Sequence, residues 1–117
     1  MSISEQAQKE LKNAFPFTES STQYIAKFAT KSGKELALER ERTEAIYLWL
    51  QKYDQNIDGV EIKNSKFPGQ AYERNQTRNS NLNEKNTPKL KLGNRAYYLK
   101  IETLGALEKV IDWYSKI

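Results

Sequence analysis

Positive charge is concentrated in one part of this 117-residue chain, the segment from Lys63 to Lys100. This segment contains nine Lys or Arg and two Glu, so its net charge is +7, whereas the whole chain carries +4. It also contains seven Asn, together with Tyr72, Tyr97 and Tyr98. Cations contact phosphates, amide side chains contact base edges, and aromatic rings stack on bases. The composition of the segment therefore indicates a surface suited to nucleic acid.

The stretch 72–83 is richest in planar hydrogen-bonding groups. Arg can contact guanine through two hydrogen bonds, and Asn or Gln can do the same at adenine. The residues that we expect to contact bases are Arg74, Asn75, Gln76, Arg78 and Asn79. Asn and Ser also dominate ordinary surface loops for backbone reasons. A solvated loop without a ligand is therefore the alternative.

Gly93-Asn94 has the sequence of a two-residue type II′ turn, which predicts a hairpin of 89–92 with 95–102. Counting outward from the turn assigns each side chain to a face of the hairpin. One face would carry Leu90, Tyr97, Leu99 and Ile101, and the other Lys89, Lys91, Tyr98 and Lys100. We expect the second face, with Arg95 after the turn, to contact phosphates and to stack a base through Tyr98. Lysine is also common on solvated edge strands, which is the alternative explanation.

A different chemistry is indicated by Val60-Glu61-Ile62-Lys63, a short strand with a Glu-x-Lys pair. This pattern resembles the second half of the PD-(D/E)xK nuclease motif. In that family the acid binds Mg²⁺ and the lysine orients or activates water, so the resemblance implies metal-assisted phosphodiester hydrolysis. The resemblance is confined to residues 60–63, and only Glu61 and Lys63 carry over. An exposed ion pair on a strand is the alternative, so neither is assigned as catalytic.

The nuclease family also needs an earlier acid, generally on a neighbouring strand. Asp54 and Asp58 are close in the sequence but are expected on the connecting turn, whereas Glu39 and Glu41 lie on a predicted strand at a more suitable separation. None of the four follows the proline of the family motif. The chain contains no histidine and no cysteine. Catalytic triads with histidine, thiolate chemistry, disulfides and zinc sites built on His or Cys are therefore excluded. We expect no cofactor and no bound metal.

The apolar content of 38% is below the level of about 45–50% that is usual in globular domains. A compact core with a large polar surface is expected. No window approaches the ~18 apolar residues that cross a bilayer, and no signal-peptide pattern follows Met1. Together with the lack of cysteine, this leads us to expect a cytoplasmic protein without a membrane partner.

Periodicity and turn residues predict the N-terminal elements. Residues 2–14 are expected to form an amphipathic helix in which Ser2 and Glu5 make a capping box. Residues 23–30 and 35–42 alternate as strands and predict a hairpin.

The segment after Thr43 fits two structures. Apolar residues at helical spacing are Ile46, Trp49, Leu50 and Tyr53. Ala45, Tyr47 and Trp49 alternate as in a strand instead. We favour a helix, because Thr43-Glu44 is a good start signal.

A short strand at 60–64, a long polar loop at about 65–88 and a final helix capped by Thr103 complete the chain. We therefore expect one domain, 1–117, of the α+β class. Its antiparallel sheet would combine an N-terminal and a C-terminal hairpin, packed by two or three helices.

The function favoured by these patterns is non-catalytic binding of nucleic acid, most plausibly double-stranded DNA. The abundance of Lys and Asn suggests a bacterial or phage origin. A second possibility is a small protein-binding inhibitor, such as an immunity protein, an antitoxin or an anti-defence protein, whose charge asymmetry steers a protein partner. The third is the Mg²⁺-dependent nuclease.

Overall fold

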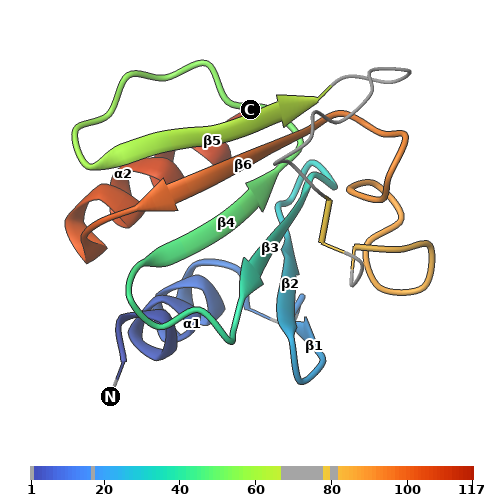
Figure 1. Cartoon of the computed structure of the whole chain (residues 1–117), viewed down its shortest axis with the longest axis horizontal. Coiled ribbons are helices and arrows are strands. Elements are labelled where there is room, and N and C mark those ends of the chain that lie inside the picture. Colours follow the sequence, from blue (N-terminus) through green and yellow to red (C-terminus); the bar gives the residue numbers. More distant parts are fainter. Residues whose placement is uncertain (1, 17, 67–77, 80–81) are drawn as a thin grey trace.

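The structure is a computed structural model that describes residues 2–16, 18–66, 78–79 and 82–117. In chain order its elements are α1 (Ile3–Ala14), β1 (Ser20–Ser21), β2 (Ile25–Ala29), β3 (Glu35–Glu39), β4 (Ile46–Leu50), β5 (Val60–Lys66), β6 (Ala96–Ile101) and α2 (Leu104–Tyr114). The six strands form one antiparallel sheet in the order β1-β2-β3-β4-β6-β5 (Figure 1). The predicted α+β class and the antiparallel sheet are confirmed.

The two helices of the described chain pack on one face of the sheet, here called the first face (Figure 1). Alternate strand residues point to this face, and Leu38, Leu48 and Leu99 meet Leu11 of α1 and Leu107 of α2 there. All five are fully buried. Both helices begin as the sequence predicts. Ser2 and Glu5 form a complete capping box, and Thr103 Oγ1 accepts the Ala106 N–H at 3.1 Å.

The opposite, second face is covered over part of its area by residues 82–95, here called the covering segment. Leu82 and Leu90 of this segment pack on Ile25, Ala37 and Trp49 of the sheet. The central strands are therefore buried on both sides, which explains why β3 and β4 contain no exposed residue.

The helix predicted after Thr43 is wrong, because residues 46–50 form β4 in the middle of the sheet. The run is Ile46-Tyr47-Leu48-Trp49-Leu50, and all five residues are buried. A strand that is covered on both faces loses the alternation of apolar and polar residues that usually identifies it. Its β-branched and aromatic residues are the signal that favoured a strand.

The hairpin predicted around Gly93-Asn94 is also wrong. Residues 88–94 form a series of turns, and β6 pairs with β4 on one side and β5 on the other. Both edges of β6 are thus occupied, which leaves no edge for a strand at 89–92. Leu90 consequently lies in the cluster on the second face, whereas Leu99, its predicted neighbour, packs on the first face.

Candidate functional site

Three segments that are distant in the sequence meet at one end of the sheet. Leu50, at the end of β4, pairs with Leu36 near the start of β3 and with Tyr97 near the start of β6. Because neighbouring strands are antiparallel, the residues just before β3, just after β4 and just before β6 must lie side by side.

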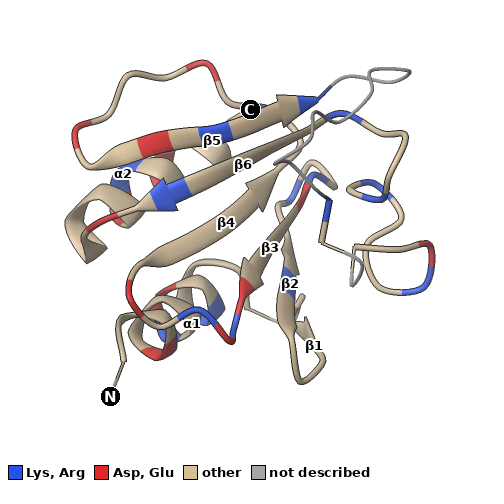
Figure 2. Ribbon diagram, viewed as in Figure 1, with Lys and Arg blue, Asp and Glu red and all other residues tan. Residues whose placement is uncertain are grey.

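A pocket of about 420 Å³ is formed at this junction. Its lining residues are Lys34 before β3, Gln51 and Lys52 after β4, and Lys89, Asn94 and Arg95 before β6. We call this the basic pocket, since four of its six lining side chains are cationic and none of those described is a carboxylate. Figure 2 shows blue ribbon from several parts of the chain around this end of the sheet.

Lys89 is fixed at the edge of the pocket by two contacts. Its Nζ donates to the Gly33 carbonyl at 2.5 Å, and its backbone N–H donates to Glu35 Oε1 at 2.8 Å. Gly33 has a φ of +88° in the turn before β3, a conformation that favours glycine. The turn therefore positions the ammonium group rather than leaving it on a flexible chain.

Among the described residues, the side-chain carboxylates of Glu35 and Asp54 lie beside lining residues of the basic pocket, and each has a partner. The buried Glu35 accepts the Lys89 N–H and lies 3.8 Å from Lys27 Nζ. Asp54 Oδ2 lies 3.9 Å from Lys52 Nζ, and both side chains are exposed. An exposed ion pair of this kind is stabilised by no more than about 1 kcal/mol. Lys52 can therefore still attract an anion.

Arg78 and Asn79, two of the residues expected to contact bases, make contacts within the protein: Arg78 holds the covering segment, and Asn79 is bound to the sheet. The Arg78 guanidinium donates to the carbonyls of Leu90, Lys91 and Asn94 at 2.7, 2.8 and 3.0 Å. Asn79 Nδ2 donates to Glu39 Oε2 at 2.8 Å. These contacts were not foreseen from the sequence, because they depend on the fold of the covering segment.

Glu39 is the centre of a polar cluster on the second face, with only 8% of its surface exposed. Besides Asn79, it accepts hydrogen bonds from Trp49 Nε1 at 3.1 Å and from the Tyr98 hydroxyl. The rings of Tyr98 and Trp49 stack with centroids 4.3 Å apart. Burial, followed by the bond to Glu39, raises the pKa of the Tyr98 phenol. One face of the Tyr98 ring is thus already used within the protein.

The remaining predicted contact residues are dispersed. Lys91 Nζ is paired with Glu84, and Lys100 Nζ lies 3.5 Å from Glu102. The strand that was to align Lys89 and Lys91 with Lys100 does not form. Arg74, Asn75 and Gln76 lie outside the described residues.

The nuclease-like pair lies on the edge strand β5. Lys63 Nζ is 3.7 Å from Glu61 Oε1, and both side chains are exposed. Two of the acids considered as the earlier acid of the nuclease motif are Glu39 and Asp58. Glu39 is separated from β5 by β4 and β6, and Asp58 lies in the turn that precedes β5. Among the described residues no group of three His, Cys, Asp or Glu is arranged to hold a metal ion.

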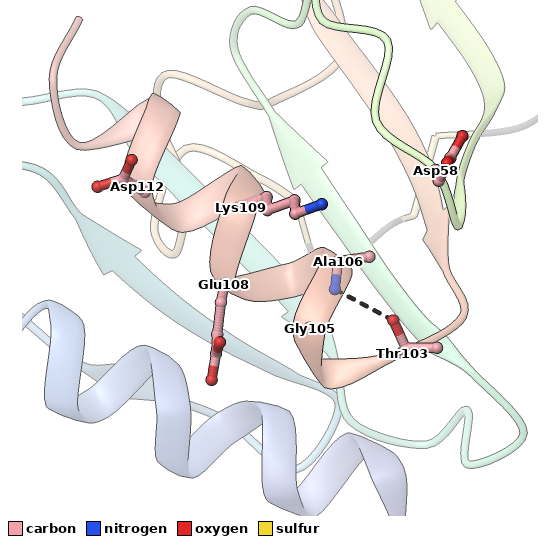
Figure 3. Close-up of a pocket in the computed structure, with 7 residues that line it drawn as sticks. All are labelled: Asp58, Thr103, Gly105, Ala106, Glu108, Lys109 and Asp112. Atoms are coloured by element: carbon pink, nitrogen blue, oxygen red, sulfur yellow. Dashed lines mark hydrogen bonds between the residues drawn. The ribbon is translucent and has the colours of Figure 1, made fainter.

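A second pocket, of about 490 Å³, runs along α2 beside the turn before β5 (Figure 3). Its charged lining residues are Asp58, Glu108, Lys109 and Asp112. Figure 3 shows that these side chains point in different directions, and Thr103 Oγ1 is bound to the Ala106 N–H. The lining of this pocket mixes three carboxylates with one cation, whereas the described lining of the basic pocket has four cations and no carboxylate.

Comparisons with models of protein families, with curated proteins and with solved structures gave no match to this chain. Neither helix of the described chain combines the length and the apolar character needed to cross a bilayer.

Proposed function

We propose that the chain binds nucleic acid, with duplex DNA as the preferred target, and that the basic pocket contacts phosphate. The observation that carries this proposal is the convergence of Lys34, Lys52, Lys89 and Arg95 from three separate segments on one hollow without a carboxylate in its described lining. Phosphate contacts supply most of the affinity for nucleic acid and do not depend on sequence.

Base contacts would come from a different part of the chain. Arg74, Asn75 and Gln76 remain the residues proposed to contact bases, because their side chains suit guanine and adenine edges. Arg78 would act indirectly, by holding the covering segment that carries Lys89, and Asn79 by attaching the chain before that segment to Glu39 of the sheet. In this proposal the basic pocket contacts the phosphate backbone of the nucleic acid, and a different part of the chain recognises the bases.

A binding panel tests the proposal. Fluorescence anisotropy is measured with double- and single-stranded DNA and RNA of one sequence, at about 50 mM and 200 mM salt. We expect duplex DNA to bind with a Kd of about 10⁻⁴–10⁻⁶ M and to weaken steeply with salt. Absence of binding to every nucleic acid at the lower salt concentration would reject the proposal.

Two charge-matched double variants locate the surface. Lys34→Ala with Lys52→Ala removes two cations from the basic pocket without breaking a contact that holds the fold. Lys9→Ala with Lys12→Ala removes the same charge from exposed positions on α1, beside Arg40 at the other end of β3. We expect only the pocket variant to weaken binding clearly. Equal effects would show that net charge, not the pocket, attracts the nucleic acid.

A protein partner is the second candidate, favoured by the side chain of Leu92 on the covering segment. It is 67% exposed and lies between Lys91 and Gly93 in the sequence. An exposed apolar side chain among cations would suit an apolar pocket with an acidic rim on a partner protein. A protein inhibitor of this kind would show no affinity for nucleic acid in the panel.

The nuclease hypothesis is tested in the same experiment. Each nucleic acid is incubated with Mg²⁺ and examined for cleavage, with Glu61→Ala as the matched variant. Cleavage that disappears in this variant would assign catalysis to Glu61 and Lys63. If the nucleic acid stays intact with the wild-type chain, the nuclease hypothesis is rejected.

A further inference from the structure

We infer that the basic pocket receives the terminal phosphate of a nucleic-acid strand, a phosphomonoester, in preference to an internal phosphodiester. This inference rests on the proposed function and names the group that the pocket binds. It follows from the charge, the shape and the donors of the pocket.

The charge of the pocket matches a terminal phosphate better than an internal one. A phosphomonoester carries about −1.5 to −2 charges at pH 7, whereas a phosphodiester in the backbone carries one. The Coulomb energy with each cation scales with that charge. Four cations around one hollow therefore favour the monoester, and the preference grows with every cation that reaches the same group.

The shape of the pocket points to the same ligand. Proteins that follow a nucleic-acid backbone use an extended groove, in which cations are arranged along successive phosphates. Here the cations come from 34, 52, 89 and 95 and line a single open pocket of about 420 Å³. An internal phosphate continues into a sugar on both sides and presents only two unesterified oxygens to the cations. A terminal phosphate continues on one side only.

Two donors of the pocket have their direction set by other contacts. Lys89 Nζ donates one hydrogen to the Gly33 carbonyl at 2.5 Å, which leaves two for a ligand. Gln51 Oε1 accepts the Glu35 N–H at 2.5 Å, so its Nε2 group is the end of the amide available to donate into the pocket. Donors held in place before binding lose less entropy when a phosphate arrives. The three terminal oxygens of a phosphomonoester can accept from both.

Oligonucleotides that differ only at their ends test this inference. One sequence is prepared with a 5′-phosphate, with a 3′-phosphate and with hydroxyl groups at both ends, and all three forms carry the same fluorophore on an internal base. We expect one phosphorylated form to bind the wild-type chain at least about 10-fold more tightly than the hydroxyl form, which corresponds to about 1.4 kcal/mol. The gain should be clearly smaller in Lys34→Ala with Lys52→Ala, which keeps only Lys89 and Arg95 among the cations of the described pocket lining, and unchanged in Lys9→Ala with Lys12→Ala.

The outcomes separate this inference from the proposed function. Equal affinity of the wild-type chain for phosphorylated and hydroxyl ends would overturn the inference and leave nucleic-acid binding intact. Absence of binding to all three would overturn both. A nucleoside monophosphate is also used as competitor. If it binds as tightly as the phosphorylated oligonucleotide, the ligand is a free nucleotide and the assignment to a strand end is wrong.

Discussion

The guanidinium of Arg78 stabilises the covering segment by donating to three backbone carbonyls, those of Leu90, Lys91 and Asn94. It also lies 5.6 Å from the centre of the Trp49 ring. A planar fork of donors can serve several carbonyls at once, which an ammonium group cannot do in the same way. An arginine in a polar, basic stretch thus has a structural role that its sequence neighbours do not reveal.

Replacing Arg78 should therefore destabilise the fold. We expect Arg78→Ala to lower the free energy of unfolding by at least about 1.5–3 kcal/mol, the range for a hydrogen bond to a charged group, and Arg78→Lys to restore only part of it. Urea denaturation followed by tryptophan fluorescence measures the change. Lys91→Ala, which removes an exposed ion pair with Glu84, is the control and should stay within about 0.5 kcal/mol of wild type. Identical midpoints for Arg78→Ala and wild type would contradict this role.

Three tyrosines make stability depend on alkaline pH. Burial raises the pKa of Tyr53 and of Tyr114, and burial together with the bond to Glu39 raises the pKa of Tyr98. Above pH ~10 the unfolded chain releases these protons while the folded chain keeps them. The unfolded state then binds fewer protons, so stability falls as the pH rises.

We therefore expect the urea midpoint to decrease steadily from pH ~10 upward, after a nearly constant range between pH 8 and 9. In Tyr98→Phe the protein loses one of these three phenols, and the decrease should be shallower even though the starting midpoint is lower. The measurement is a series of denaturation curves from pH 8 to 11. The same slope in Tyr98→Phe and wild type would show that Tyr98 does not titrate differently in the two states.

At the scale of elements, some helices and strands could be predicted from residues close to them in the sequence, and others could not. Both helices were predicted because their caps, Ser2 and Thr103, and their apolar stripes lie within a few residues of each other. β2, β3 and β5 were predicted from alternation and turn residues. β4 and the covering segment were not, because their structure depends on what lies on both sides of them. β4 lacks alternation because it is covered on both faces, and no strand forms at 89–92 because β6 is already paired with β4 and β5.

Leu90 and Leu92 distinguish the observed segment from the predicted hairpin. Two residues apart on one strand, they would share a face and have similar surroundings. In the structure Leu90 is 0% exposed and Leu92 is 67% exposed. We expect Leu90→Ala to cost about 2–5 kcal/mol of unfolding free energy, and Leu92→Ala to cost less than about 0.5 kcal/mol. Thermal and urea unfolding of the two variants measure this contrast, and similar losses would argue against the observed turns.

At the scale of the whole molecule, the candidate site exists only because strands pair. The charge run of the sequence contains Lys89 and Arg95 of the basic pocket, and these were predicted to contact phosphate. Lys34, Gln51 and Lys52 were missed, since they lie in ordinary polar turns far from that run. The pairing of Leu50 with Leu36 and Tyr97 brings all of them together. Such a site becomes predictable only when the strand order is known.

The salt dependence of binding tests the central claim most directly, because it counts the cations that contact phosphate. The affinity for one duplex is measured from about 50 to 200 mM salt for wild type, for Lys34→Ala with Lys52→Ala and for Lys9→Ala with Lys12→Ala. Each phosphate contact contributes about 0.9 to the slope of log K against log salt for B-form DNA. The pocket variant should therefore have a slope shallower by about 0.9 if Lys34 and Lys52 share one phosphate, and by about 1.8 if they contact two. The α1 variant should keep the wild-type slope. Parallel lines for all three proteins would contradict the account, since they would show that the basic pocket makes no contact with phosphate.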